Sequence, residues 1–123
     1  MSGYYEWQNT ASGKQPWYFT ARDDSPLTAA GIWDWWKNSE TGEMLLSCSM
    51  IITEPNAYVA EVHDRMPVLL MQEQFEPWLK CEAGDEYLKP APDDLLQKWP
   101  ISQRVNSSKA STEDPSLIEK IAA

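Results

Sequence analysis

The chain has 123 residues and a formal net charge of −9, with 10 Lys and Arg against 19 Asp and Glu. Its length predicts one modest domain or part of a larger one, and its charge excludes a general basic surface that would bind nucleic acid by counterion release, so any DNA contact would have to be local. Seven tryptophans and five tyrosines indicate aromatic side chains that pack on sheets or line a groove.

Alternation of apolar and polar residues predicts two β-hairpins in the first half of the chain. In the third strand, packing of Trp33 and Trp35 against a neighbouring layer is favoured over stacking on bases. In the fourth strand, Cys48 shares a face with apolar residues and is expected to be a small buried side chain. The four strands are expected at residues 2–8, 15–22, 28–36 and 44–53.

A helix is expected to follow the fourth strand. Thr53 can cap this helix, and Val59 and Val62 lie on its apolar side. Pro67 argues against extending it, and residues 66–70 are apolar enough for a short buried strand. The chain direction therefore changes between the helix and that strand, at a place where side chains can be presented to a cleft.

The second half of the chain is expected to alternate short helices with polar loops. Trp99 and the two leucines before it lie at helical spacing, and Pro100 ends that segment. Helices are expected at residues 72–80, at residues 93–99 and from residue 114 onward, a strand at 101–105, and loops at 81–92 and 106–113.

The two cysteines, Cys48 and Cys81, have no second Cys or His at metal-ligand spacing, so neither a metal site nor a cofactor is expected. No apolar run reaches the length of a membrane span, and residues 1–20 lack the layout of a signal peptide. The sequence therefore predicts a soluble, cytoplasmic protein with reduced thiols and no membrane partner.

His63 is the one histidine in the chain, and it lies where the chain direction is expected to change. An imidazole and a carboxyl have different reference pKa values, so His63 and Glu6 would form an acid-base pair of two different strengths if both side chains faced one cleft. Each residue also has a simpler interpretation, because a single histidine is often structural and Glu6 lies on the polar side of a strand.

Arg65 can hold a phosphate or carboxylate through its planar guanidinium, or can form an ion pair with Asp64 or another carboxylate. Several enzyme classes are disfavoured by missing motifs. The chain has no Gly-x-Ser-x-Gly turn, no phosphate-binding glycine loop and no His-Glu-x-x-His pair. A hydrolase that uses Glu6 and His63 on a small substrate is a weaker interpretation, because no nucleophile or metal set accompanies them.

Several segments, taken in order, resemble the SOS response-associated peptidase (SRAP) family. The most specific are the Gly-x-x-Glu-Trp block near the start and the His-Asp-Arg-Met-Pro block in the middle. The segments are Ser2-Gly3-Tyr4-Tyr5-Glu6-Trp7, Trp33, Ile51-Ile52-Thr53, His63-Asp64-Arg65-Met66-Pro67-Val68-Leu69-Leu70, Val105-Asn106 and Asp114-Pro115-Ser116-Leu117-Ile118.

This resemblance implies an α+β fold around a curved, mainly antiparallel, barrel-like sheet with short flanking helices and a groove for single-stranded DNA. It also implies recognition of abasic sites, which family members trap as a covalent thiazolidine crosslink through an N-terminal cysteine. By the same resemblance, Glu6 is the catalytic glutamate that shuttles protons, His63 assists opening of the abasic sugar, and Arg65 lies near the DNA backbone.

One departure from the family pattern is large. The residue after the initiator is Ser2, and it belongs to the Gly-x-x-Glu-Trp block rather than to a cysteine start. Residues 1–123 are therefore expected to form the C-terminal portion of an SRAP domain, without the N-terminal half and its nucleophile. Two alternatives stay open, a non-catalytic acidic interaction domain and a truncated relic of the family. Exposed sheet edges would favour self-association in either case.

Overall fold

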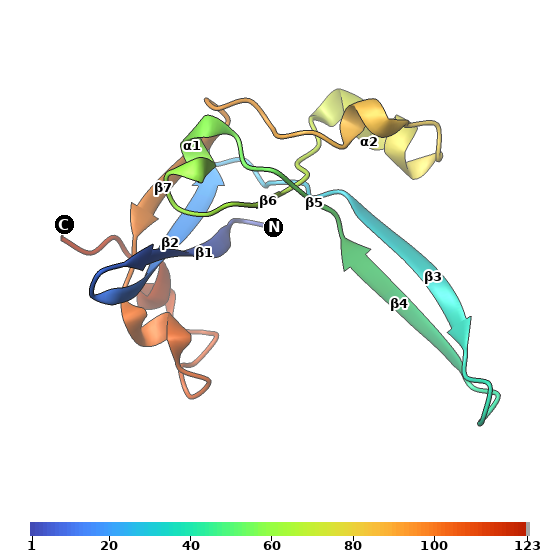
Figure 1. Cartoon of the computed structure of the whole chain (residues 1–123), viewed down its shortest axis with the longest axis horizontal. Helices are drawn as coiled ribbons and strands as arrows, with labels where there is room; N and C mark the ends of the chain where they lie inside the picture. The colour runs from blue at the N-terminus through green and yellow to red at the C-terminus, as the bar shows by residue number, and fades with distance from the viewer. Residues whose placement is uncertain (123) are drawn as a thin grey trace.

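The computed structural model describes residues 1–122 as three small antiparallel sheets with short helices around them (Figure 1). The expected α+β class and mainly antiparallel pairing are confirmed, although the sheets remain separate and do not close into a barrel. The sheets are β1 (Tyr4–Thr10), β2 (Gly13–Ala21) and β7 (Leu96–Pro100) in the order β1-β2-β7; β3 (Gly31–Lys37) with β4 (Met44–Met50); and β5 (Ile52–Thr53) with β6 (Met66–Pro67).

The helices are all short. Two are α-helical, α1 (Ala57–Ala60) and α2 (Gln72–Leu79), and three are single 3₁₀ segments, η1 (Asp85–Tyr87), η2 (Gln103–Asn106) and η3 (Pro115–Ile118). Among residues 1–122, none of these helices has the length and apolar composition needed to cross a membrane.

In the first hairpin, the register of β1 and β2 places the alternate side chains of the two strands on the same faces of the sheet. Tyr4 pairs with Phe19 and Glu6 pairs with Trp17, so one face of β1 and β2 carries all four side chains. Gly3 lies against this hairpin at very close range, since a Cβ atom there would stand 2.4 Å from the carbonyl oxygen of Phe19. A side chain at position 3 would therefore force the backbone apart.

The main hydrophobic core lies between this sheet and α1. Phe19 is fully buried at its centre, and the Tyr4 ring stacks on it with centroids 5.0 Å apart. On the opposite face of the sheet, Tyr18 is buried and its paired neighbour Trp99 of β7 packs edge-on against it at 5.5 Å. The buried members of the core are Phe19, Ala21, Leu27, Val59, Val62, Met66, Leu69, Ala91 and Leu96.

Helix α1 begins later than the sequence predicts. The cap is Asn56 rather than Thr53, because the Asn56 side chain accepts a hydrogen bond from the Val59 amide at 2.8 Å. The same buried side chain donates to the carbonyl of Ala91 at 2.9 Å, so it joins the helix to the segment that leads into β7. Thr53 instead pairs with Met66 in β5 and β6.

Two predictions in the second half were wrong. The expected helix at residues 93–99 is largely strand β7, because the open edge of β2 accepts Leu96–Pro100 as a third strand. The expected strand at 101–105 is reduced to a single bridge between Ile101 and Lys120, followed by η2. The helical spacing of apolar residues in 93–99 was overridden by pairing with β2.

Other expectations in this half fared better. The helix expected at 72–80 is present as α2, which continues through Pro77. The expected strand at 66–70 is buried throughout but is only partly paired, as β6 and a bridge between Ala29 and Leu69. The last helix is a single 3₁₀ turn capped by the Asp114 side chain.

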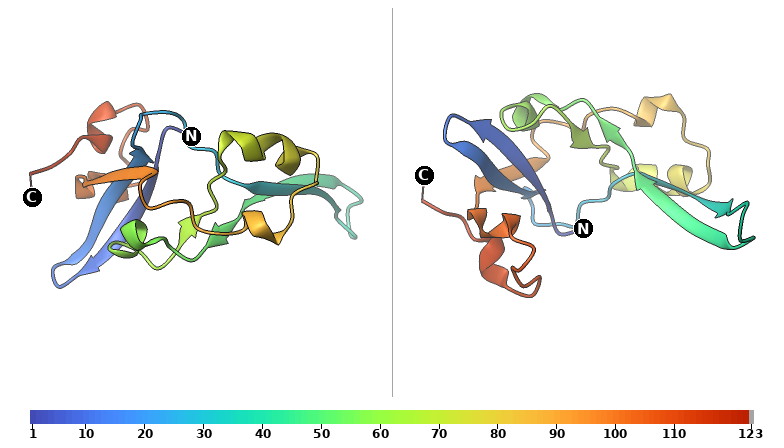
Figure 2. Two further views of the ribbon diagram at one scale, coloured as in Figure 1. Left: turned by 90° about the horizontal axis from the view of Figure 1, so that it is seen from above. Right: turned by 60° about the horizontal axis from the view of Figure 1, so that its bottom comes forward.

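Strands β3 and β4 form a two-stranded ribbon that projects away from the rest of the molecule (Figures 1 and 2). Every residue of both strands is exposed. The expected packing of Trp33 and Trp35 against a neighbouring layer and the expected burial of Cys48 were therefore wrong for this chain. Alternation in sequence correctly assigns residues to faces, but nothing among residues 1–122 covers either face.

Candidate acid-base site

Glu6 faces α1 because it lies on the same side of β1 as Gln8. The Gln8 amide donates to the Glu61 carbonyl, at the C-terminal end of α1, at 2.8 Å, and its oxygen accepts from the Trp17 indole at 3.1 Å. These two bonds bring the end of the helix against β1. The polar side of the strand is thus partly covered, and only 21% of the Glu6 side chain is exposed.

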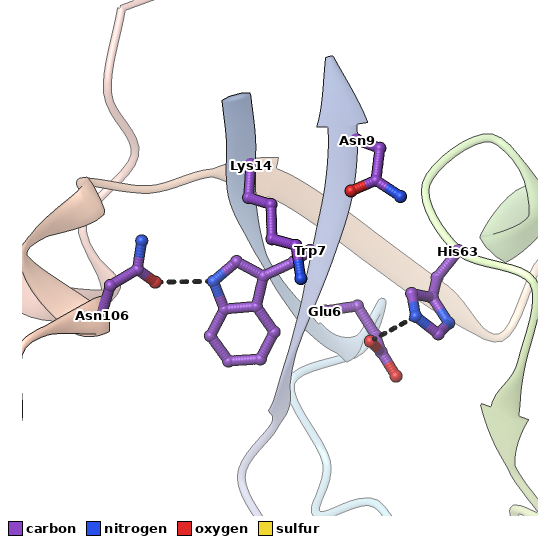
Figure 3. Close-up of a pocket in the computed structure, with 6 residues that line it drawn as sticks. All are labelled: Glu6, Trp7, Asn9, Lys14, His63 and Asn106. Carbon is purple, nitrogen blue, oxygen red and sulfur yellow. Dashed lines mark hydrogen bonds and ion pairs between the residues drawn. The ribbon is translucent and has the colours of Figure 1, made fainter. Parts of the chain in front are cut away.

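His63 follows α1 by three residues, and its backbone amide donates to Val59 at 3.0 Å. Its Nε2 lies 3.5 Å from a carboxylate oxygen of Glu6 (Figure 3). The structure therefore brings together two of the three predicted site residues, although they come from opposite ends of the first half of the chain. Both side chains keep a part of their surface open to solvent.

The proton on the neutral His63 ring can be assigned from its neighbours. The Arg65 amide donates to Nδ1 at 3.2 Å, so Nδ1 is the acceptor nitrogen and the proton of the neutral ring lies on Nε2. This arrangement points an N–H of His63 at the Glu6 carboxylate. The Asp64 side chain is almost fully exposed, and its Oδ1 lies 3.3 Å from Nδ1. Asp64 would form an ion pair with His63 only when the imidazole ring is protonated.

Burial raises the pKa of the Glu6 carboxyl above its ordinary value. The charge that His63 carries when it is protonated, a hydrogen bond from the Trp7 amide and the positive charge of Arg65 oppose this effect without cancelling it. A carboxyl whose pKa is raised is a better proton acceptor and donor near neutral pH than an ordinary surface glutamate. The carboxyl of Glu6 therefore has the properties of a group that takes up and returns a proton.

Glu6 and His63 border an open pocket of about 350 Å³. Its other walls were not predicted as site residues. The Trp7 indole donates to the Asn106 side chain at 2.6 Å, which ties β1 to η2 across the pocket (Figure 3). Asn9 and Lys14 pair with each other in the hairpin on the strand face of Trp7, and both line the pocket, although the sequence predicted a loop there. The full lining is Glu6, Trp7, Asn9, Lys14, His63 and Asn106.

The third predicted residue, Arg65, does not line this pocket. Its guanidinium is largely exposed, and its Nε lies 3.6 Å from Asp64 Oδ1. The ion pair that the sequence allowed is therefore present. Because both partners are exposed, this pair is weak and leaves the guanidinium available to another anion.

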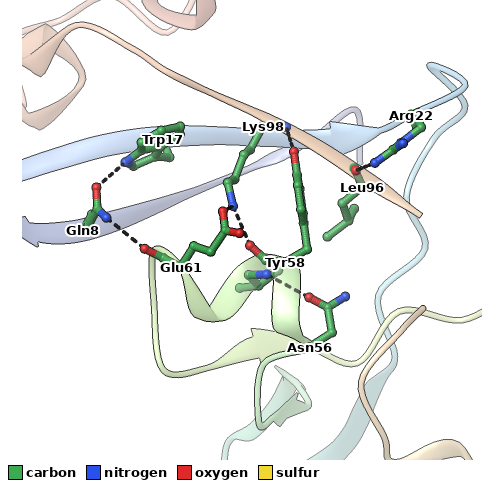
Figure 4. Close-up of polar contacts among 9 residues, drawn as sticks. Gln8, Trp17, Arg22, Asn56, Tyr58, Glu61, Leu96 and Lys98 are labelled. Atoms are coloured by element: carbon green, nitrogen blue, oxygen red, sulfur yellow. Dashed lines mark hydrogen bonds and ion pairs between the residues drawn. The ribbon is translucent and has the colours of Figure 1, made fainter. Parts of the chain in front are cut away.

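A buried lysine supports the helix that carries His63. The Lys98 ammonium of β7 is only 7% exposed, and it donates to the Tyr58 carbonyl and to the Glu61 carboxylate, both at 2.5 Å (Figure 4). It also lies 3.9 Å from the centre of the Tyr58 ring. Lys98 lies on the same sheet face as Phe19, with which it pairs, and thus fixes α1 to the sheet immediately before the His63 turn.

No cysteine lines the pocket that residues 1–122 form, and its ionisable side chains are the Glu6 carboxyl, the His63 imidazole and the Lys14 amine. Both cysteines are exposed, and Cys48 lies on the projecting ribbon, away from β1 (Figure 1). Among residues 1–122, no three of the side chains that commonly bind metals gather into a cluster.

Comparisons with known proteins agree on one family. A family model described as SOS response associated peptidase (SRAP) matches residues 1–108. The abasic site processing protein YoqW of Bacillus subtilis (strain 168) is 32% identical, and the match covers 94% of this chain and 53% of that protein. The abasic site processing protein HMCES of Xenopus tropicalis is 31% identical over 91% of this chain and 40% of its own length.

A solved structure from Bacteroides thetaiotaomicron superposes with a TM-score of 0.88 at 29% identity, over 98% of this chain and 54% of that one. The chain spans about half the length of the curated relatives it matches or less. The family match covers most of its residues, and the blocks around Glu6 and His63 both lie within it. This chain therefore belongs to the SOS response associated peptidase (SRAP) family.

Proposed function

We propose that this chain supplies the proton-transfer groups of an abasic-site processing centre that acts on single-stranded DNA. The observation that carries the proposal is the 3.5 Å approach of His63 Nε2 to the Glu6 carboxylate at the edge of an open pocket. The relatives named above are abasic site processing proteins, which agrees with this assignment.

The abasic sugar is a cyclic hemiacetal that must open before its aldehyde can react. Opening breaks the bond between C1′ and O4′, removes a proton from the C1′ hydroxyl and adds one to O4′, so no net proton is gained or lost. In our proposal the Glu6 carboxylate accepts the first proton, and His63 in its imidazolium form donates the second from Nε2 and becomes neutral. The pair is restored when the proton passes from Glu6 to His63 across the short gap.

The later covalent step needs a different group. An amine and a thiol on adjacent carbons add to the aldehyde, release one water molecule and close a thiazolidine ring. Neither Cys48 nor Cys81 carries a free α-amine beside its thiol, and residue 2 is serine. We therefore assign no nucleophile within this chain and limit the roles of Glu6 and His63 to proton transfer.

Contacts with the DNA backbone would have to come from a few cations, since the net charge is −9. Lys14 lines the pocket beside Glu6, and Arg65 lies at the surface next to His63. In the proposal these two side chains hold phosphates on either side of the abasic sugar, and the uncharged walls of the pocket receive the sugar itself.

The test supplies the missing nucleophile from solution. Single-stranded DNA with one abasic site is incubated with free cysteine, and thiazolidine formation on the DNA is followed by mass spectrometry with and without the chain. We expect the chain to accelerate the reaction, and Glu6→Gln and His63→Ala to lower that acceleration at least about tenfold. DNA affinity, measured by fluorescence anisotropy, should remain within about twofold because neither residue is assigned to phosphate binding.

Asp64→Asn is the matched control, because Asp64 adjoins His63 but is almost fully exposed. It should leave the acceleration nearly unchanged. No acceleration by the unaltered chain, or equal acceleration by the Glu6 and His63 variants, would refute the proposal. So would a covalent DNA adduct of the chain itself on a denaturing gel, since that requires a nucleophile that we do not assign.

A second function, that of an interaction module, is favoured by one observation. The β3–β4 ribbon exposes apolar side chains on both faces, which is typical of a surface that binds another protein. An acidic chain with such a ribbon would bind a partner whether or not Glu6 and His63 act on DNA. The identity of that partner is a separate question.

A further inference from the structure

The strongest unexplained feature is one face of the β3–β4 ribbon, which we call the tryptophan face. The register places Trp33 opposite Cys48 and Trp35 opposite Leu46, and Met50 lies at the base of the same face. Trp33 is 69% exposed and Trp35 is 52% exposed. The reverse face differs, because Ile32, Trp36 and Leu45 alternate there with Asp34, Ser47 and Ser49.

Contacts between β3 and β4 alone are not expected to keep the ribbon folded in water. A two-stranded hairpin is marginally stable in water unless its apolar face is covered. Here only the base is anchored, by the bond from the Trp78 indole to the Gly31 carbonyl at 3.1 Å and by pairing of Ile51 with Ala30. Beside that base, α2 and β3 enclose an open hollow of about 320 Å³. Large apolar surfaces of this kind mark interfaces.

The solved relative from Bacteroides thetaiotaomicron indicates what covers the tryptophan face. Its match covers 98% of this chain at a TM-score of 0.88, so the ribbon must be extended in that protein too. Almost half of that longer chain lies outside the match. A ribbon that is unstable alone but keeps its form in the relative needs support from residues beyond those matched.

Charge argues against two other occupants. Between Gly31 and Met50 the cation is Lys37, against Asp34, Glu40 and Glu43, so DNA phosphates would be repelled from the ribbon. A second copy would bring together two chains that each carry a net charge of −9. Neither argument applies to a neutral or basic polypeptide with an apolar face.

We propose that the tryptophan face binds a polypeptide equivalent to the part of an SRAP structure that this chain does not match, and that side chains of this partner enter the hollow beside Gly31. The partner packs an apolar layer on Trp33, Trp35 and Leu46. This inference does not depend on the proposed function, because the ribbon lies apart from β1 and α1 (Figure 1), and Glu6 is on β1 while His63 follows α1.

The test is co-expression of the full 123-residue chain, carrying an affinity tag, with the part of the Bacteroides thetaiotaomicron relative that lies outside the match. Co-expression lets the two polypeptides fold together. We expect them to co-purify as a one-to-one complex by light scattering, and amide exchange in β3 and β4 to slow at least about tenfold in the complex. The double variant Trp33→Ser, Trp35→Ser should abolish the complex.

The matched control is Trp36→Ser on the reverse face, which should leave the complex intact. Circular dichroism of each variant shows whether the chain is still folded, which is expected because no ribbon residue lies in the core. Absence of co-purification would overturn the proposal. A homodimer that the Trp33 and Trp35 changes disrupt, or single-stranded DNA bound through these tryptophans, would replace it with the corresponding occupant.

Discussion

The β1-β2-β7 sheet and the β3–β4 ribbon are built from similar residues but differ in how they are stabilised. Both are antiparallel, and both contain large aromatic side chains in their strands. In the sheet, β2 has a strand on each side and α1 over one face, so Phe19 is fully buried. In the ribbon, each strand has one partner and both faces meet solvent.

This difference shows that an alternating pattern predicts which side chains share a face of a strand. It does not predict which other part of the protein packs on that face. For β1 and β2 the cover is α1, which also brings His63 to Glu6. For β3 and β4 the cover is not among residues 1–122. The region that carries the proposed chemistry is therefore self-supporting, whereas the ribbon depends on a partner.

The largest contrast should appear when one aromatic residue is truncated in each region. Phe19→Ala removes a fully buried ring and should lower the free energy of unfolding by about 3–5 kcal/mol. Trp35→Ser removes a half-exposed ring that packs on no other layer, and should change it by less than about 0.5 kcal/mol. Urea denaturation followed by circular dichroism measures both. Equal losses would mean that the ribbon is held by the chain itself.

Lys98→Met should separate α1 from the sheet while keeping the apolar stem. The variant loses the charged bonds to Tyr58 and Glu61, so we expect a loss of about 2 kcal/mol in the free energy of unfolding. The acceleration of aldehyde capture should fall as well, because His63 follows that helix. Glu61→Gln is the control with a smaller effect, since its carboxylate is mostly exposed. A fully active Lys98→Met protein would show that α1 is positioned by the core alone.

Tyr4→Phe should stabilise the sheet. The Tyr4 hydroxyl is buried and has no hydrogen-bond partner in the part of the chain that the structure describes, and its burial raises its pKa well above the usual range. Removing it keeps the stacked ring and should add about 1 kcal/mol to the free energy of unfolding. A lower urea midpoint for Tyr4→Phe would indicate that a water molecule or another partner satisfies this hydroxyl.

Glu6→Gln should also stabilise the chain, by less than about 1 kcal/mol at pH 7, because the carboxyl keeps contact with water. The raised pKa means that the ionised form costs free energy in the folded state. Below about pH 4 the carboxyl is protonated in both folded and unfolded chains, and the difference between variant and wild type should vanish. Thermal melts at several pH values measure this. A difference that grows on acidification would contradict the direction of the shift.

Sequence reasoning predicted the parts of the fold that depend on local pattern. The first hairpin, α2 and the apolar 66–70 segment follow from alternation, spacing and proline placement. It failed at β7, because residues 93–99 have helical spacing and only the open edge of β2 makes them a strand. It failed again at Cys48, because no local signal states whether a face is covered.

In the candidate site too, the sequence predicted the residues but not the tertiary contacts that bring them together. Glu6 and His63 were singled out from their residue types and from the family resemblance, but their approach depends on Gln8, Lys98 and the end of α1. Lys14 and Asn106 reach the pocket through strand register and through the bond between Trp7 and Asn106, neither of which the sequence states. The hairpin register, once known, would have located Lys14.

The late arrival of β7 has a consequence for biogenesis. On the ribosome, β1 and β2 can pair as soon as they emerge, but β2 keeps a bare edge until residues 96–100 have been synthesised. Lys98 belongs to that last strand, so the imidazole cannot be held in place before residue 98 has been synthesised. A nascent chain that stalls earlier would expose the unpaired edge of β2, which can pair with strands of other chains and cause aggregation. Chaperones that cover this edge would then raise the yield of folded protein.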